Sequence, residues 1–160
     1  DGLTVTAFRV DHDPVDPAVG YRFDYKGRSV VISGDTVQSA NLQQFAQGVD
    51  VLLHEALAPH LVEVITKSAQ AAGRTRIAQL TVDILDYHTT PIEVAEIARD
   101  ANVGWLVYYH IIPPLPIAPL EEIFLRGVAD IYDGPVTVGR DGTFIQLEAG
   151  SEEIIVEELQ

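Results

Sequence analysis

Two short apolar runs, each closed by a histidine, constrain the fold of this chain more than any other feature. Val49–His54 contains an uninterrupted stretch of aliphatic residues, and Trp105–Tyr109 is a second run that leads directly into His110. Runs of this length predict buried strands. Between them, Thr90–Glu93 predicts a helix start, because a threonine cap, a proline at the first helical position and a glutamate at the third can form a capping box. We expect this helix to end near Asn102.

Two hairpins are expected outside this central unit. Tyr21–Tyr25 and Ser29–Ile32 flank a Lys-Gly-Arg turn, and Val136–Val138 and Thr143–Leu147 flank an Arg-Asp-Gly turn. Short alternating or β-branched runs on either side of a glycine-containing turn are typical of antiparallel pairs.

The remaining segments complete a single α/β (α+β) domain over residues 1–160. Strands that alternate with helices predict a mixed sheet with helices on one face. Prolines predict irregular loops, and an acidic tail is expected to fray. The elements expected are a strand at Leu3–Val10, helices at Asn41–Gln47, Leu61–Ala72, Ile77–Leu85 (helix favoured over strand) and Leu120–Val128, loops at Asp11–Ala18 and Ile111–Pro119, and a frayed tail from Ser151.

Composition restricts the partners and the site chemistry. The chain has 24 acidic and 10 basic residues and a formal charge of −14, so we expect no nucleic-acid partner, because a phosphate backbone requires clustered Lys and Arg. It contains no cysteine, which leaves histidine and carboxylate side chains for any metal. No apolar run is long enough to cross a bilayer, and we expect no membrane partner. The chain opens at Asp1 rather than at a methionine, which suggests that an upstream segment has been removed and leaves the compartment undefined.

Polar residues with metal-binding capacity follow the predicted strands. His12, Asp35, His54 and His110 each stand at or just beyond a strand end, and His88 precedes the capped helix. Loops at strand ends are where sites form in such sheets. Imidazole and carboxylate groups are zinc ligands, and a carboxylate can bridge two ions. Taken singly, His12 is more typical of a solvated loop, and His54 fits a buried core histidine as well as it fits a functional one.

At these residues the chain resembles the metallo-β-lactamase fold, in its ribonuclease Z and arylsulfatase-like branch, and within it the C-terminal half of the αββα sandwich. The resemblance covers nearly the whole chain and is carried by blocks in the expected order. These blocks are Val5–His12 followed by Gly20–Phe23, Ser33–Thr36, Leu52–Ala56, and His88–Thr90 followed by Leu106–His110.

The resemblance implies a two-zinc site. His12 is expected to bind one metal, His110 the other, and Asp35 to bridge them. The family motif His-x-His-x-Asp-His, which normally precedes these blocks, is absent. The chain therefore supplies three ligands where a two-metal site needs about seven. We expect this chain alone to be poorly active or inactive, and its parent to be a zinc-dependent hydrolase.

The resemblance also implies catalytic and supporting residues. His88 is expected to be the general acid that protonates the leaving oxygen, and Glu55 to orient it. His54 and Thr36 are expected to support the loops. His60 follows a proline near a helix start, and we interpret it as structural or solvated.

For the substrate, the resemblance and the charge together favour a small sulfate or phosphate ester. Ribonuclease Z enzymes that process tRNA commonly carry a long arm between the third histidine and the bridging aspartate. Here only the 22 residues 13–34 separate His12 from Asp35, and the predicted hairpin uses most of them.

Three alternatives stay open at this point. One is a ribonuclease Z-like phosphodiesterase. Another is a metal-free or weakly metal-binding half-fold that self-associates as a binding module, since half a sandwich exposes an apolar sheet face. The third is a site completed by another polypeptide, such as a complementary N-terminal half.

Overall fold

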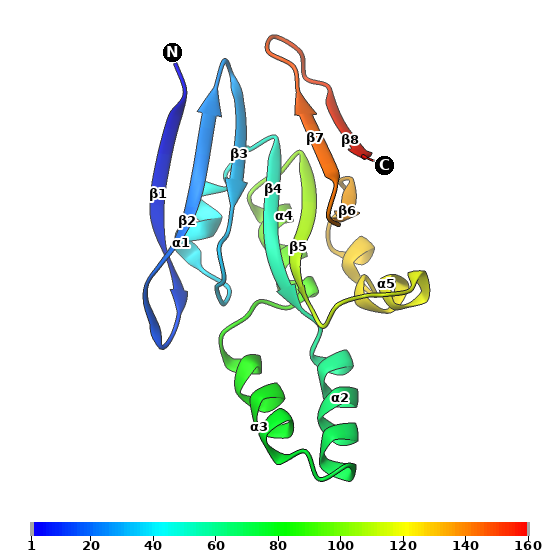
Figure 1. Cartoon of the computed structure of the whole chain (residues 1–160). Helices are drawn as coiled ribbons and strands as arrows, with labels where there is room; N and C mark the ends of the chain where they lie inside the picture. Colours follow the sequence, from blue (N-terminus) through cyan, green and yellow to red (C-terminus); the bar gives the residue numbers. More distant parts are fainter. Residues whose placement is uncertain (1, 160) are drawn as a thin grey trace.

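The computed structural model, which describes residues 2–159, is built around one mixed sheet (Figure 1). Its strand order is β1-β2-β3-β4-β5-β6, with antiparallel pairing from β1 to β3 and parallel pairing from β3 to β6. A separate sheet pairs β7 with β8. The strands are β1 (Thr4–His12), β2 (Val15–Tyr25), β3 (Arg28–Ile32), β4 (Val51–Leu57), β5 (Trp105–Ile112), β6 (Val136–Val138), β7 (Thr143–Leu147) and β8 (Ile154–Glu158).

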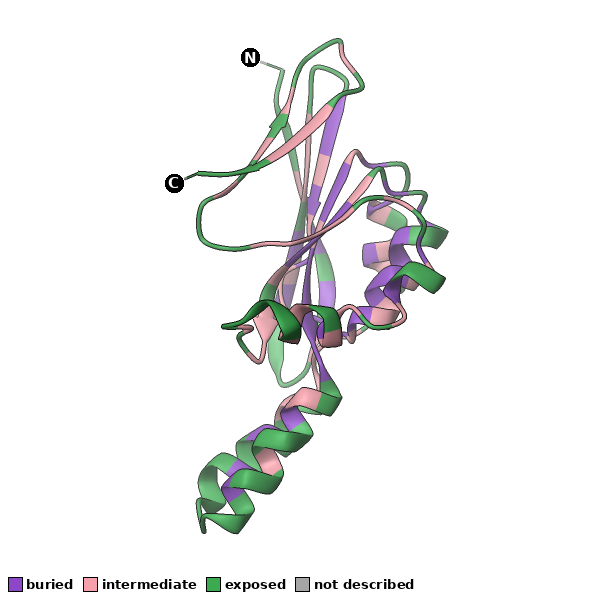
Figure 2. Ribbon diagram, turned by 90° about the vertical axis from the view of Figure 1, so that its right-hand side faces the viewer, coloured by how far each residue is buried: buried purple, intermediate pink, exposed green. Residues whose placement is uncertain are grey.

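Helices α1 (Ala40–Phe45) and α4 (Pro91–Asp100) cover one face of the large sheet, and β7 and β8 lie on its other side (Figure 2). The core lies between the sheet and these helices, and its members include Leu42, Leu52 and Ile97. The capping box at Thr90 is confirmed: its hydroxyl accepts from the Glu93 amide, and the Glu93 carboxylate accepts from the Thr90 amide. The predicted mixed sheet with helices on one face is also confirmed.

Helices α2 (Pro59–Ala71) and α3 (Thr75–Asp83), with the 3-10 turn η1 (Ile84–Asp86), project beyond the sheet edge (Figures 1 and 2). We call residues 59–86 the arm. The buried residues of the two helices are small or medium in size: Val62, Ala69, Ala78 and Thr81. The remaining helical elements are α5 (Ala118–Phe124) and the 3-10 turn η2 (Val128–Asp130). None of the helices within residues 2–159 has the length and apolar character needed to cross a membrane.

The second predicted hairpin is wrong. Val136–Val138 pairs in parallel with β5, where Leu106 lies opposite Val136, and it closes the edge of the large sheet. Thr143–Leu147 instead pairs with β8. The Arg-Asp-Gly turn therefore connects two sheets, because the parallel edge of β5 offers Val136–Val138 a buried partner.

Three predicted irregular segments are also partly ordered. Residues 15–18 belong to β2, which at this point has a neighbour on one side only, the position at which a sheet tolerates proline. Residues 111 and 112 extend β5, and α5 already begins at Ala118, with Pro119 in its first turn. The expected frayed tail contains β8, whose apolar start pairs with β7. Arg28 fixes the preceding turn by donating to the carbonyls of Ser151 and Glu153.

Candidate functional site

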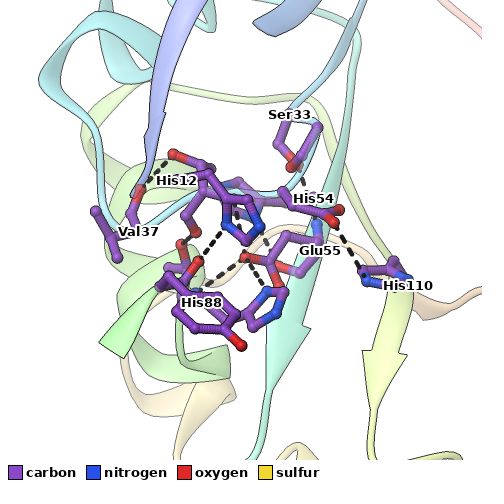
Figure 3. A network of polar contacts seen from close by, with 12 residues as sticks. His12, Ser33, Val37, His54, Glu55, His88 and His110 are labelled. Atoms are coloured by element: carbon purple, nitrogen blue, oxygen red, sulfur yellow. Dashed lines mark hydrogen bonds and ion pairs between the residues drawn. The ribbon is translucent and has the colours of Figure 1, made fainter. Parts of the chain in front are cut away.

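The sheet topology brings the predicted site residues to one edge (Figure 3). β1, β3, β4 and β5 point the same way, because two antiparallel pairings separate β1 from β3 and the others are parallel. Their carboxyl ends deliver His12, Asp35, Glu55 and His110. His88 reaches the same edge from the segment between the arm and α4.

His12 and His110 both lie at irregularities in their strands. The β1–β2 register shifts between Val10 and His12, and the β4–β5 register shifts so that His110 has no paired residue. His110 also has a left-handed backbone, with φ of 43°. Bulges that re-aim a side chain, and non-glycine residues with positive φ, are concentrated at functional sites. The bulge directs His110 Nε2 to 3.6 Å from Asp35 Oδ2.

Asp35 is presented by a tight loop after β3. Gly34 has φ of 66°, and a Cβ on it would lie 2.4 Å from the carbonyl oxygen of Val19, so only glycine fits there. The side chains of Asp35 and His110 remain 43% and 47% exposed. This pair is therefore accessible to a ligand from solvent.

Glu55 is fully buried and links the loops that carry the other residues. Its Oε1 accepts from the amides of Thr36, at 3.2 Å, and Thr89, at 3.0 Å. The same oxygen lies 3.2 Å from His88 Nδ1, close enough for an ion pair but without hydrogen-bond geometry. The Thr89 hydroxyl donates to the Thr36 carbonyl at 2.6 Å. One carboxylate thus holds the Asp35 loop against the segment that carries His88.

Thr36 extends this network to β1. Its hydroxyl oxygen accepts from the Asp11 amide at 3.1 Å, and the Val37 amide donates to the Asp11 carbonyl at 2.8 Å. The backbone just before His12 is therefore tied to the Asp35 loop. Thr89 was not among the predicted site residues, because a threonine before an N-cap has no distinctive sequence pattern.

The rings of His12, His88 and His110 form a row. Their centroids lie 5.2 Å apart between His12 and His88, and 5.9 Å between His88 and His110. His12 Nδ1 lies 2.8 Å from the Tyr87 carbonyl oxygen. A histidine anchored through one ring nitrogen presents the other to a metal or a proton acceptor.

His54 and His60 stand apart from this row. His54 is completely buried, its Nδ1 lies 2.7 Å from the Glu55 carbonyl oxygen, and its Nε2 has no hydrogen-bond partner among the described residues. Burial lowers the pKa of His54, against the opposing effects of that backbone contact and of the Glu55 charge, and favours the neutral ring. His60 is exposed at the start of α2.

Sequence reasoning missed a cavity of about 260 Å³ beside His110. Tyr109, His110, Arg140 and Asp141 line it together with Leu53 and other apolar side chains. Tyr109, which the sequence suggested was core, thus borders the site. Burial raises its pKa, and the charges of Asp35 and Glu55 act in the same direction. Arg140 forms an ion pair with Glu121. The available signal for Arg140 was its position in a turn, two residues after a short strand.

Imidazole and carboxylate donors suit zinc, but the described donors are too few for a complete site. Within residues 2–159 no three or more His, Asp or Glu side chains are grouped so that they could hold a metal ion. The nearest arrangement is the Asp35–His110 pair, with His12 further along the row. A structural or catalytic zinc needs at least three protein ligands.

The chain is similar to proteins of one superfamily. Residues 1–111 match a family profile described as "Beta-lactamase superfamily domain". Ribonuclease Z of Mycobacterium avium is 36% identical over 151 residues, which cover 94% of this chain and 50% of that protein. Ribonuclease Z of Mycobacterium tuberculosis is 38% identical over 143 residues, which cover 88% and 47%. The chain therefore spans about half the length of the curated relatives it matches.

The fold also matches a solved structure. The metallo-β-lactamase fold protein YhfI of Bacillus subtilis has a TM-score of 0.60 and 18% identity, over 86% of this chain and 47% of that one.

The expectation that nucleic acid is not a partner is wrong. The sequence relatives contradict it, because their name describes enzymes that act on RNA. Net charge misled that prediction, because it averages over surfaces that differ locally. The matched profile establishes that this chain belongs to the beta-lactamase superfamily, and the matched structure shows the metallo-β-lactamase fold.

Proposed function

We propose that this chain forms one side of the active site of a metal-dependent phosphodiesterase that cleaves RNA. One observation carries the proposal: the buried carboxylate of Glu55 fixes the segments of Asp35 and His88 at the edge where His12 and His110 also lie. The relatives named Ribonuclease Z favour a phosphodiester over the small sulfate or phosphate ester expected from the sequence.

Asp35, His110 and His12 are the residues that would hold metal. Carboxylate oxygen and imidazole nitrogen are the donors that zinc uses, and Asp35 and His110 already face each other. Such an ion, when bound, supplies a Lewis acid for the phosphate oxygens and an activated water.

Residues 2–159 group too few ligands for a metal ion, and we propose that a His-x-His-x-Asp-His segment outside this chain supplies the others, with this chain as the C-terminal part of the fold. The half-length match to the relatives supports this division. The exposed face of the sheet also supports it. Val5, Tyr21 and Tyr25 are large and exposed, and they lie on the face opposite to the one that buries Phe8 and Val10.

His88 would give its proton to the leaving oxygen of the cleaved P–O bond. Its Nδ1 faces Glu55, which leaves Nε2 to hold that proton. Glu55 acts through His88 and is a positioning residue. General acids of this kind contribute about 10²–10⁴-fold to the rate.

The test uses a polypeptide that joins this chain to the His-x-His-x-Asp-His segment, with bound zinc and cleavage of bis(p-nitrophenyl) phosphate and of a structured RNA as readouts. Asp35→Asn should lose both metal and activity. His88→Gln should keep the metal but lower kcat by about 10²-fold or more. His60→Gln, at an exposed position, is the control and should change neither. Cleavage by a metal-free protein, or full activity in Asp35→Asn, would overturn the proposal.

A further inference from the structure

The arm carries the densest unpaired basic charge in an otherwise acidic chain. Residues 68–82 contain no aspartate or glutamate, whereas the whole chain has 24 acidic and 10 basic residues. Lys67, Arg74 and Arg76 flank the turn at the tip and are exposed. Lys67 pairs with Glu63 within α2. Neither guanidinium at the tip, Arg74 or Arg76, forms an ion pair or a side-chain hydrogen bond with any described residue.

The arm is anchored directly in the candidate site. It begins two residues after Ala56–Leu57 of β4, the strand that carries Glu55, and it returns to His88 after η1. α2 has 13 residues, which at 1.5 Å per residue places the tip about 20 Å beyond the sheet edge. The views in Figures 1 and 2 both show this projection. A small ester bound at Asp35 and His110 does not extend that far, whereas a nucleic acid does.

We infer that the arm tip is a docking surface for the phosphate backbone of the RNA that is cleaved at the sheet edge. This inference rests on the proposed function. Two unpaired arginines hold phosphates by bidentate hydrogen bonds and by charge, and a basic cluster on one face is the electrostatic mark of nucleic-acid binding even where net charge is negative. The arm shaft exposes Val64 and Leu80, 62% and 56% accessible, which suit a protein partner. The cations are at the tip and the aliphatic side chains lie along the shaft, so RNA is the partner that the tip favours.

The experiment measures binding of a fluorescently labelled RNA hairpin to this chain by anisotropy over a range of salt concentrations. The variant R74E/R76E reverses both tip charges. The matched control K26E/R99E makes the same charge change at exposed positions on the body of the molecule. R74E/R76E should weaken binding by about tenfold or more and reduce the slope of log K against log salt by about 1.4–1.8, the value for two lost phosphate contacts. The control should keep the slope of the parent chain.

Equal losses in the two double variants would overturn the inference, because they would reflect net charge alone. Unchanged RNA binding in R74E/R76E, together with loss of a dimer seen by analytical ultracentrifugation, would assign the tip to a protein contact and also overturn it. Failure here is separable from failure of the proposed function. The small ester bis(p-nitrophenyl) phosphate tests the site alone, and its cleavage in the joined polypeptide should be the same with and without R74E/R76E.

Discussion

Consecutive residues of this chain pass from a fully buried polar network into an arm that is mostly exposed. From His54 to Ala58 every side chain is buried, and the Glu55 carboxylate has three neighbours with N–H or imidazole groups. In the arm, which starts at the next residue, the two helices bury chiefly small side chains against each other. Buried polar groups fix geometry because each unmade hydrogen bond is costly, whereas an exposed two-helix unit can vary without affecting the fold. The two regions should therefore respond very differently to substitution.

The largest effect is expected at Glu55. Glu55→Ala leaves the buried amides of Thr36 and Thr89 without an acceptor, and each such donor costs about 1–3 kcal/mol, so the free energy of unfolding should fall by about 3 kcal/mol. Urea denaturation measures it. Glu55→Gln, which keeps an oxygen, should lose less. Glu63→Ala on the arm, whose partner Lys67 is exposed, should be indistinguishable from the parent. A Glu55→Ala chain of unchanged stability would remove the contrast between the two regions.

The next largest effect is expected in the pH dependence of the free energy of unfolding, and it arises from the buried region. Because burial lowers the pKa of His54 in the folded state, the unfolded chain binds a proton first as the pH falls below the ordinary value of 6.5. Stability contributed by the neutral ring is therefore complete above that value and declines below it, by up to about 1.4 kcal/mol per pH unit. Urea midpoints in the acidic range should show this slope, reduced in His54→Phe and retained in His60→Gln on the arm. If the slope of stability against pH is unchanged in His54→Phe, a titrating group other than His54 causes it.

A smaller loss is expected at Thr89. Thr89→Val removes the hydroxyl that donates to the Thr36 carbonyl and should lower the free energy of unfolding by about 1 kcal/mol. Thr89→Ser keeps the donor and should recover most of it. If Thr89→Val is as stable as the parent chain and Thr89→Ser is less stable, the methyl packing of Thr89 matters and its hydrogen bond does not.

The elements that were predictable are those whose signal is local. The runs around Leu52 and Leu106 have the length and composition of buried strands, and the Thr90 capping box is complete within four residues. The pairing of Val136–Val138 was not predictable, because three residues suit either a hairpin or a parallel edge and the choice depends on β5. β8 was missed because its acidic neighbours concealed a short apolar stretch that β7 stabilises.

The candidate site divides in the same way. Histidines and Asp35 could be found from chemistry and strand ends, and the structure places them at one edge. The bulge that frees His110 and the role of Thr89 depend on register and on contacts between segments distant in sequence, which no local pattern contains. The basic residues of the arm form a local cluster in the sequence. The net charge of −14 for the whole chain concealed this cluster.

The smallest effect is expected inside the arm, where the Thr66 and Thr81 hydroxyls lie 2.8 Å apart between α2 and α3. Valine has the same branched shape as threonine, so T66V/T81V replaces both partners and leaves no unpaired donor between the helices. Replacement of both partners by apolar groups of the same shape is nearly neutral, and the double variant should stay within about 0.5 kcal/mol of the parent in urea denaturation. T81V alone should cost slightly more, because it leaves Thr66 facing a methyl group. A loss in the double variant as large as that of Thr89→Val would mean that the arm is specified by its polar contacts as strictly as the network around Glu55, and the contrast between the two regions would then be one of exposure alone.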